Sequence, residues 1–449
     1  MKFILDDDSV KRILSDIEIS NKKTVIIYPG ESDVRQPVHT LYGGAHLFKY
    51  NSIEKLNGIA LKTFLEIASD EKILAGILEW KANDRLNKII YDKVIEKLNN
   101  GAIEDFRIDF EDGFGLRSEK EEDETSEFTA IEFAKAMKNK MLPPFSGIRI
   151  KSFSETAKRR AIKTLNIFLT TLINKTGGKL PENFIITLPK VISSEHVKAL
   201  KDLLELFEYR FNIEPGFLKF EIMLETTQVI FNSEGKINIL PLLKEGGNRF
   251  KSIHLGLYDF TSSCEISPEF QNYNHPLCNF ARQVLKIALA GTGITISDGA
   301  TNLIPATLLK EKEFTEKEKT ENIKAIHNSW KVIYENVFHS LKFGIYQGWD
   351  LHPSQIPIRY AAVYRFFLEE FEGVSERMRN FIDKTARATL TGDIFDDAAT
   401  GQGMLNFISR AYNCGAINEK DLSGAGLTLK DVKQDSVLQI ITSRTNILQ

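Results

Sequence analysis

Cysteine is scarce in this chain, and its scarcity limits the kinds of site that the protein can hold. Among 449 residues there are three cysteines, Cys264, Cys278 and Cys414. Their number is odd and no two of them have CxxC spacing, which argues against a disulfide framework and against a structural zinc site. We therefore expect the protein to work in a reducing compartment, the cytoplasm.

An excess of basic residues is missing as well. The chain has 58 Lys and Arg against 61 Asp and Glu, which leaves a formal net charge of −3. A protein that binds nucleic acid normally depends on a basic excess for its affinity. The balance of charge therefore argues against nucleic acid as a partner.

Long apolar runs are also lacking. No stretch approaches the roughly 18 apolar residues that a membrane span requires. The least charged segment, 287–309, is interrupted by three glycines, by Asp298 and by Pro305. Consecutive aspartates at positions 6 to 8 end any signal-peptide core too early. We expect a cytoplasmic protein that makes no membrane contact.

What the chain does contain is a repeated unit: a short run typical of a β-strand, a turn, and then a helical pattern. Hydrophobic residues make up 42% of the sequence, enough for a large core. About eight strands that alternate with helices suit a (β/α)8 barrel or an open doubly wound sheet. The predicted strands are 24–28, 106–110, 147–150, 184–188, 220–224, 252–257, 294–296 and 343–348.

The strand signals fade near the end of the chain. From Arg359 onward the sequence predicts helices, for example over 361–372 and 404–412. We divide the chain into a helical segment 1–22, a barrel domain 23–358 and a helical C-terminal extension 359–449.

Charged residues alternate with apolar ones in several of the predicted strands. In FRIDFE, at 106–111, the apolar side chains point one way and the charged ones point the other. GIRIK and KFEIMLE show the same alternation, which predicts a barrel whose interior becomes polar toward its mouth. Barrel active sites are built at the carboxyl ends of the strands. The charged residues at those ends are Glu111, Asp112, Arg149, Lys190, Glu225 and Asp259.

Two carboxylates from neighbouring strand ends, with no cysteine or histidine cluster beside them, suit an oxygen-seeking cation such as Mg²⁺ or Mn²⁺. A guanidinium nearby, such as that of Arg149, offers a fixed fork for a carboxylate or a developing enolate oxygen. Each residue also has a plain structural alternative. Glu225 and Asp259 can simply pair with basic residues, and Lys190 is more typical of an ion pair than of a Schiff-base nucleophile.

Two histidines are candidates for a general base. We place His39 near the end of the first barrel strand and His352 after the last one, so both are expected at the mouth of the barrel. An imidazole at either position has an ordinary pKa suited to proton transfer near neutral pH. A hydrogen-bonded structural role is the alternative for both.

Taken in order, these strand ends resemble the motifs of the citrate lyase β-subunit-like and HpcH/HpaI aldolase family. The resemblance covers roughly 24–358, and it implies a (β/α)8 barrel of the phosphoenolpyruvate/pyruvate type. It also implies a homo-oligomer. The matching segments are RIDFEDG, GIRIKS, LPKV, MLETTQ, LGLYDFT, SDGA and LHPSQI.

Carried over to this sequence, the resemblance implies that Glu225 and Asp259 ligate Mg²⁺ or Mn²⁺. It implies a carbon–carbon lyase or aldolase that acts through a metal-stabilised enolate on a 2-oxo acid related to pyruvate or oxaloacetate. Arg149 is the catalytic residue that the resemblance implies, and Asp112 and His39 are further candidates for catalysis. The implied substrate-binding residues are Arg149, Glu111, Lys190 and His352.

Some features depart from the family pattern. Asp112 follows Glu111 where the aldolases carry a catalytic histidine, so the base is left open between Asp112 and His39. Glu225 and Asp259 also lie farther apart than usual, which implies an insertion near 233–249, and the different start of the chain around Arg35 and His39 suggests a separate branch. Two other functions stay open: a citryl-CoA lyase-like or malate synthase-like enzyme acting on an acyl-CoA, and a non-catalytic barrel that binds a metabolite or partner.

Overall fold

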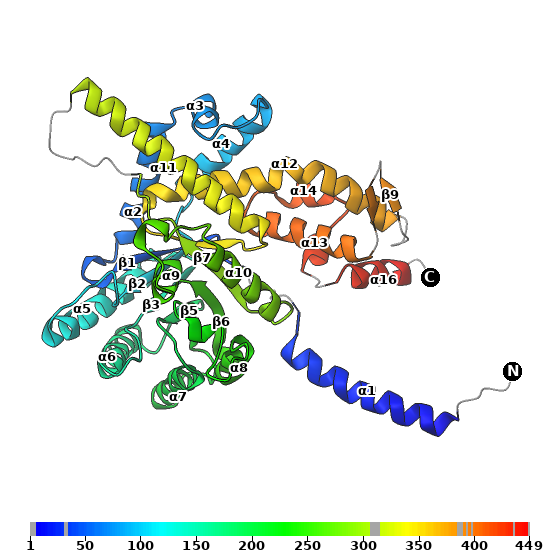
Figure 1. The fold of residues 1–449 in the computed structure, drawn as a ribbon, viewed down its shortest axis with the longest axis horizontal. Coiled ribbons are helices and arrows are strands. Elements are labelled where there is room, and N and C mark those ends of the chain that lie inside the picture. The colour runs from blue at the N-terminus through cyan, green and yellow to red at the C-terminus, as the bar shows by residue number, and fades with distance from the viewer. Residues whose placement is uncertain are drawn as a thin grey trace.

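The computed structural model describes residues 6–30, 35–305, 315–383, 389–391, 394–396, 398–433 and 436–447. Its centre is a closed barrel of parallel strands in the order β1 to β8, with helices around it (Figure 1). This confirms the predicted (β/α)8 barrel and excludes the open sheet. The strands are β1 His39–Gly44, β2 Asp105–Asp109, β3 Phe145–Arg149, β4 Phe184–Leu188, β5 Lys219–Leu224, β6 Phe250–Leu255, β7 Thr295–Ala300 and β8 Gln347–Asp350.

Helices cover the outside of the barrel and continue beyond it. Among the described residues, no helix is both long enough and apolar enough to cross a membrane. The helices up to the last strand are α1 Asp7–Ile27, α2 Ser52–Ile67, α3 Glu71–Ile77, α4 Asp84–Asn99, α5 Glu119–Lys138, α6 Lys158–Thr176, α7 Ser194–Phe211, α8 Ile239–Gly246, α9 Leu257–Ser263, α10 Pro276–Leu289 and α11 Glu316–Lys342.

The first predicted strand, 24–28, is wrong. That segment is the end of α1 and the residue after it, and the first strand of the barrel is β1 at His39–Gly44. A short run of β-branched residues favours a strand only where it can pack on a sheet. Here Val25 is 62% exposed and continues a helix that begins at the Asp6 cap. The helical N-terminal segment therefore extends past the predicted boundary at residue 22.

The barrel interior is polar at mid-height. Arg107 of β2 donates two hydrogen bonds of 3.1 Å from Nε and Nη2 to the carboxylate of Glu221 on β5. His254 Nε2 lies 3.0 Å from Glu221, and His254 Nδ1 lies 3.1 Å from the Tyr42 hydroxyl. Each buried charge in this layer has an opposite charge beside it, which offsets the cost of removing it from water.

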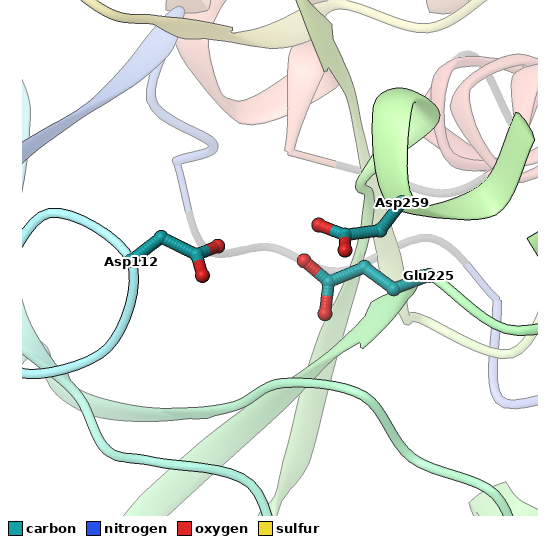
Figure 2. A group of neighbouring side chains, drawn as sticks. All are labelled: Asp112, Glu225 and Asp259. Carbon is teal, nitrogen blue, oxygen red and sulfur yellow. The ribbon is translucent and has the colours of Figure 1, made fainter. Parts of the chain in front are cut away.

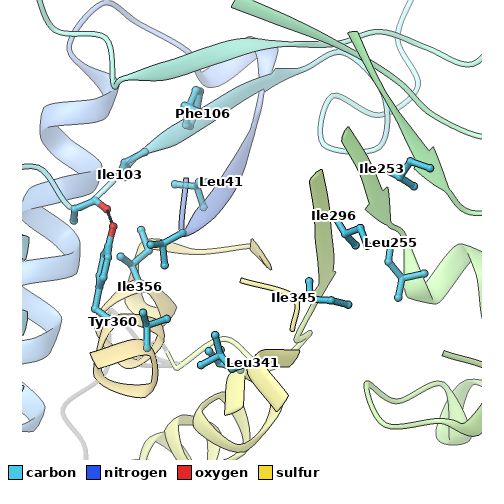
Figure 3. Packing of buried hydrophobic residues seen from close by; sticks show 14 of the residues in the cluster. Leu41, Ile103, Phe106, Ile253, Leu255, Ile296, Leu341, Ile345, Ile356 and Tyr360 are labelled. Atoms are coloured by element: carbon cyan, nitrogen blue, oxygen red, sulfur yellow. Dashed lines mark hydrogen bonds between the residues drawn. The ribbon is translucent and has the colours of Figure 1, made fainter. Parts of the chain in front are cut away.

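The apolar core lies between the strands and the helices. On β2 to β6 isoleucine, phenylalanine and leucine side chains at outward positions are buried, and Ile108, Ile148 and Ile186 have no exposed surface. Figure 3 shows the part of this core around β1, β8 and α12 (Ile356–Asp383). There the hydroxyl of Tyr360 donates a 2.8 Å hydrogen bond to the Ala102 carbonyl, so α12 is tied to the segment before β2.

The C-terminal extension packs at the amino end of the barrel. Arg410 Nη1 donates to Gln36 Oε1 at 3.1 Å, and Arg35 Nε donates to the Asn413 carbonyl at 3.2 Å. Gln36 and Arg35 precede β1, so this contact lies at the end opposite the strand carboxyl ends. The extension continues from α12 with β9 Thr389–Thr391, β10 Ile394–Asp396, α13 Ala398–Asn413, α14 Glu419–Gly424, α15 Leu429–Val432 and α16 Val437–Ile447.

Candidate metal centre and active site

Three carboxylates meet at the mouth of the barrel. Glu225 follows β5, Asp259 lies in α9 just after β6, and Asp112 lies in the loop after β2. Each offers an oxygen that lies within 4.8 Å of the other two, and Figure 2 shows the side chains pointing toward one another. The structure therefore brings the two predicted ligands together and adds Asp112, which we predicted to be a catalytic residue rather than a ligand.

Glu225 is the buried member of this centre, with 1% of its surface exposed. Its Oε2 accepts a 2.8 Å hydrogen bond from the backbone N–H of Lys190, while Oε1 is buried without a hydrogen-bond partner. Burial raises the pKa of Glu225 to about 8 and also raises the pKa of the half-buried Asp259. An unpartnered buried carboxylate oxygen that faces two further carboxylates is a position for a cation to satisfy.

The donor set identifies the class of cation. Asp112, Glu225 and Asp259 offer hard oxygen atoms, and no cysteine or histidine belongs to the group. Such ligands suit Mg²⁺ or Mn²⁺, which keep further coordination positions for water or substrate. These residues therefore fit the metal that the sequence predicted.

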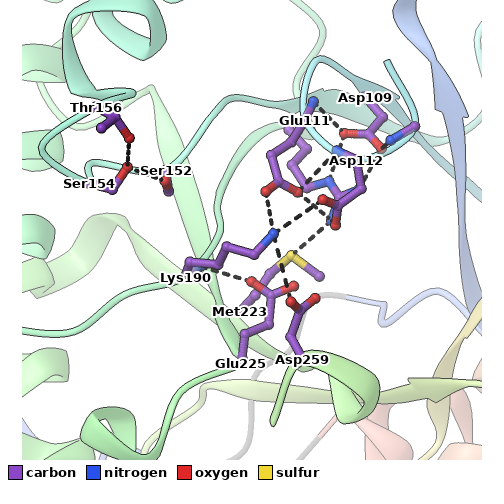
Figure 4. A network of polar contacts seen from close by, with 12 residues as sticks. Asp109, Glu111, Asp112, Ser152, Ser154, Thr156, Lys190, Met223, Glu225 and Asp259 are labelled. Carbon is purple, nitrogen blue, oxygen red and sulfur yellow. Dashed lines mark hydrogen bonds and ion pairs between the residues drawn. The ribbon is translucent and has the colours of Figure 1, made fainter. Parts of the chain in front are cut away.

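Lys190 balances the negative charge of the centre (Figure 4). Its Nζ contacts Glu111 and lies 3.1 Å from Asp112 Oδ1 and 3.8 Å from Asp259 Oδ1. Burial acts to lower the pKa of Lys190, but the hydrogen bond to Glu111 and the nearby carboxylates outweigh it and raise the pKa above the ordinary lysine value. A protonated lysine is not a nucleophile, so this geometry favours an ion-pair role.

Glu111 and Asp112 form a coupled acid pair. Burial and the hydrogen bond to Asp112 raise the pKa of Glu111 against the opposing charge of Arg149. Burial also acts on Asp112, but the hydrogen bond to Glu111 and the positive charges of Arg149 and Lys190 lower its pKa. The two shifts have opposite directions, so Asp112 is the more readily ionised member of the pair and the one better suited to bind a cation.

Arg149 is fixed in place at the end of β3. Its Nε donates to Asp109 Oδ1 at 2.7 Å, and its Nη2 donates to the other oxygen of the same carboxylate. Its Nη1 lies 3.3 Å from Glu111 and 3.5 Å from Asp112. The guanidinium also sits 5.1 Å from the ring centre of Tyr42. One edge of the fork is thus held by Asp109, while Nη1 faces the carboxylates at the mouth.

Asp109 is the residue that sequence reasoning missed. Besides holding Arg149, it accepts backbone hydrogen bonds from Glu111 at 2.9 Å and from Gly113 at 2.7 Å, so it shapes the loop that carries Asp112. A Cβ on Gly113 would lie 2.5 Å from Asp109 Oδ2, so this approach needs a glycine. The available signal was the alternation in FRIDFE, which places Asp109 on the same face as Glu111.

His39 does not reach this site, so the prediction of His39 as a residue of the mouth is wrong. It is the first residue of β1, paired with Gly348 at the amino end of the barrel, and it is fully buried. Burial lowers its pKa to about 4, and its Nδ1 lies 3.9 Å from Asp350. The error follows from the misplaced first strand, because a strand that starts at His39 puts this residue at the opposite end.

His352 lies after β8, at the carboxyl end of the barrel. Its Nδ1 is 2.6 Å from the Ser354 hydroxyl and accepts the Ser354 backbone N–H, so it caps the short helix η5 Pro353–Gln355. The predicted role of His352 in substrate binding stays a prediction.

Gly256 tests the packing of the centre. A Cβ at this position would lie 2.3 Å from Glu225 Cγ and 2.8 Å from Glu225 Oε1. We expect Gly256→Ala to displace Glu225, to weaken Mn²⁺ binding by about tenfold or more, and to lower the free energy of unfolding by roughly 1–3 kcal/mol. Mn²⁺ titration followed by electron paramagnetic resonance, together with denaturant unfolding, measures both effects. Gly58→Ala, in α2 with nothing near the added Cβ, is the matched control; unchanged Mn²⁺ affinity in Gly256→Ala would contradict the expectation.

The raised pKa of Glu225 predicts a pH-dependent effect of metal. Between pH 4.5 and about 8 the folded protein keeps a proton on Glu225 that the unfolded chain has released. Protonated Glu225 therefore makes its full contribution to the free energy of unfolding below pH 4.5, and this contribution is lost as the pH rises through about 8. A bound cation needs the ionised carboxylate, so we expect Mn²⁺ to raise the unfolding temperature more at about pH 8.5 than at about pH 6. Equal shifts at both pH values in thermal unfolding would contradict this.

Solved structures with a similar fold include a citrate lyase from Burkholderia xenovorans LB400, with 16% identity and a TM-score of 0.56 over 87% of this chain and 97% of that chain. CitE from Mycobacterium tuberculosis, in complex with magnesium, acetoacetate and coenzyme A, has 13% identity and a TM-score of 0.46 over 84% and 99% of the two chains. A Haloferax volcanii malate synthase has 13% identity and a TM-score of 0.45 over 90% and 99%. At 16% identity, the similarity to the citrate lyase shows only that the two folds are alike. The predicted resemblance to citrate lyase-type barrels is therefore confirmed for the fold.

Comparisons of the sequence itself give a different result. No curated protein matches the chain. One family model, described as "Domain of unknown function (DUF6986)", matches residues 17–440. The match begins within α1, spans the barrel and ends within α16, so it covers nearly the whole chain. The chain therefore belongs to the DUF6986 family.

Proposed function

We propose that this protein is a Mg²⁺- or Mn²⁺-dependent carbon–carbon lyase that acts through an enolate on a 2-oxo acid related to pyruvate or oxaloacetate. One observation carries the proposal: the unpartnered buried oxygen of Glu225, toward which Asp112 and Asp259 converge beside Arg149. The similarity in fold to a citrate lyase, an enzyme that breaks a carbon–carbon bond, is in keeping with this class of reaction.

Asp112, Glu225 and Asp259 would hold the cation, which when bound would supply Lewis-acid stabilisation of negative charge on a substrate oxygen. Arg149 would supply a second positive group. Because Asp109 engages its Nε and Nη2, the Nη1 at the mouth is the edge that can donate to a keto or carboxylate oxygen. A guanidinium already fixed in position loses little freedom when the substrate arrives, which favours the transition state.

The proton transfers of a cleavage fall to the acid pair beside the centre. In the cleavage direction, a carboxylate takes the proton of a 4-hydroxyl group, the bond between C3 and C4 breaks to leave an aldehyde and an enolate, and a proton returned to C3 yields the 2-oxo acid. The acid pair of Glu111 and Asp112 can take the proton of the hydroxyl group and return it to C3, and within the pair the pKa of Glu111 is raised while that of Asp112 is lowered. His39, the other predicted base, lies at the far end of the barrel.

The acyl-CoA alternative has weaker support from the geometry. Its nucleotide phosphates would need free basic residues, and Lys158, Arg159 and Arg160 at the start of α6 are the candidates. In the structure Arg160 Nη2 lies 2.7 Å from Asp123, and Lys158 Nζ lies 2.6 Å from Glu155. Two of these three cations are therefore paired within the protein.

Proton exchange of pyruvate in D₂O tests the proposal without knowledge of the natural substrate. We expect the methyl signal of pyruvate to disappear from the proton spectrum when protein and Mg²⁺ or Mn²⁺ are present, and to persist when EDTA is added. Acetyl-CoA in place of pyruvate tests the alternative. Exchange of acetyl-CoA alone would replace the 2-oxo acid with an acyl-CoA substrate, and exchange of neither would favour a barrel that binds without turnover.

A further inference from the structure

A cavity lies at the amino end of the barrel, opposite the carboxylate centre. Its volume is about 280 Å³, and the first or second residue of every strand from β2 to β8 lines it. Arg35 and Gln36, which the C-terminal extension contacts, form part of its wall. Pockets that hold drug-sized ligands have volumes of roughly 300–1,000 Å³. This cavity is slightly smaller and therefore suits a small metabolite.

The floor of the cavity is charged, but its charges are paired within the protein. Asp105, Arg107 and Glu221 all line it. Arg107 donates from Nη1 to Asp105 and from Nε and Nη2 to Glu221. Glu221 also contacts His254 and accepts the hydroxyl of Ser252 at 2.8 Å. The charged groups of the floor therefore satisfy one another and do not need a ligand.

Two lysines at the rim of the cavity lack such partners. Lys219 begins β5 and Lys251 is the second residue of β6, so they stand on neighbouring strands, and both line the cavity. Lys219 Nζ donates a hydrogen bond of 3.3 Å to the backbone carbonyl of Asn248. Among the residues that the structure describes, no carboxylate forms an ion pair with either ammonium group. The rim therefore carries two uncompensated cations.

The carboxylates near the rim do not balance these cations. Glu182, which also lines the cavity, is exposed before the start of β4. Glu104 is engaged by two other basic residues, Arg35 and Lys97. One free carboxylate against Lys219 and Lys251 leaves an excess of positive charge at the rim.

The two lysines also disfavour each other. Partial burial lowers the pKa of both, and the positive charge of Lys251 lowers the pKa of Lys219 further. Residues at the amino end of a barrel usually serve stability, whereas two like charges without a counter-charge reduce it. An anion beside both ammonium groups would remove this repulsion.

We propose that the cavity at the amino end of the barrel is a ligand site, in which Lys219 and Lys251 bind the carboxylate or phosphate group of a small metabolite. Either group offers enough oxygens to accept one charge-assisted hydrogen bond from each ammonium. The polar floor at Arg107 faces the remainder of the bound molecule. The site lies at the opposite end of the barrel from the metal centre and does not depend on the function proposed for that centre.

Titration with two simple anions tests the site. We expect calorimetry of the metal-free protein at constant ionic strength to give a dissociation constant of about 1 mM or lower for inorganic phosphate or for malonate. Lys219→Gln combined with Lys251→Gln should raise this constant by about tenfold or more, because both charged donors are lost. Tighter binding of phosphate would assign a phosphorylated ligand to the site, and tighter binding of malonate would assign a dicarboxylate.

A charge-matched variant separates the site from the net charge of the protein. Lys55→Gln combined with Lys72→Gln removes two exposed lysines of α2 and α3 that do not line the cavity. We expect it to bind the anions as the wild type does. Absence of binding by the wild type at about 10 mM anion, or equal dissociation constants for the wild type and the Lys219 and Lys251 double variant, overturns the proposal.

Two further measurements locate the anion and verify the fold. We expect phosphate or malonate to slow the acetylation of Lys219 and Lys251, followed by mass spectrometry, and to leave Lys55 and Lys72 unaffected. Without anion, the Lys219 and Lys251 double variant should unfold at a temperature no lower than that of the wild type, because it has lost a repulsion. Acetylation of both rim lysines at unchanged rates in the presence of bound anion would place the anion elsewhere and overturn the assignment.

Discussion

Glu225→Gln is expected to abolish Mn²⁺ binding at the barrel mouth and to lower metal-dependent exchange of pyruvate protons by about a thousandfold or more. Glutamine keeps the size of the side chain, and its amide can still accept the backbone N–H of Lys190. It removes the negative charge that a cation requires from the one buried member of the centre. The substitution should leave the fold intact, because it replaces a desolvated acid by a neutral group.

Three measurements on Glu225→Gln separate loss of the site from loss of the fold. Mn²⁺ titration reports the centre, pyruvate exchange reports the chemistry, and thermal unfolding without metal reports the fold. Above pH 8 in the absence of metal, we expect the variant to unfold at a higher temperature than wild type, since wild type then carries a buried carboxylate. Glu234→Gln, a change on an exposed loop, is the control. Wild-type exchange in Glu225→Gln would exclude the proposed role of the centre.

Arg149→Lys is expected to lower pyruvate exchange by about a hundredfold or more while Mn²⁺ still binds. A lysine keeps one positive charge but cannot hold both oxygens of Asp109 and also present a donor at the mouth. Arg149 contributes no ligand to the cation, so its loss should separate catalysis from metal binding. We expect the free energy of unfolding to fall by roughly 1–3 kcal/mol, because the buried Asp109 loses part of its hydrogen bonding.

Asp109→Asn is the companion variant for Arg149→Lys. It leaves the guanidinium in the protein but removes the charged group that fixes its orientation. We expect an intermediate loss of exchange, carried mainly by kcat, since the donor is present but poorly placed. If Arg149→Lys exchanges pyruvate at the wild-type rate, Arg149 is a structural partner of Asp109 and not a substrate ligand.

Much of the barrel could be predicted from the sequence, because side chains along a strand alternate between two environments. The predicted strand 184–188 coincides with β4, and the predictions for β2, β3, β5 and β6 begin or end within about two residues of the observed strands. The same alternation placed Glu111, Arg149 and Glu225 at strand ends. Parallel strands of a barrel bring their carboxyl ends together, so residues far apart in sequence could be assigned to one site.

Other features could not be read from local pattern. The β-branched run at 24–28 is compatible with a strand or a helix, and the absence of a sheet beside it made it a helix. The first strand is therefore β1 at His39–Gly44, and His39 lies at its amino end rather than at the mouth of the barrel. When the first strand is assigned to the wrong segment, a residue such as His39 is placed at the wrong end of the barrel.

An α/β fold of alternating strands and helices and a set of oxygen-bearing site residues could be predicted from the sequence alone, because alternation, strand count and side-chain type are local properties. Tertiary structure decided which acids meet and in what state. Asp112 joins the centre because Asp109 holds its loop, and Arg149 points to the mouth because the same carboxylate holds its fork. The raised pKa of Glu225 arises from burial, which depends on how distant segments pack around it.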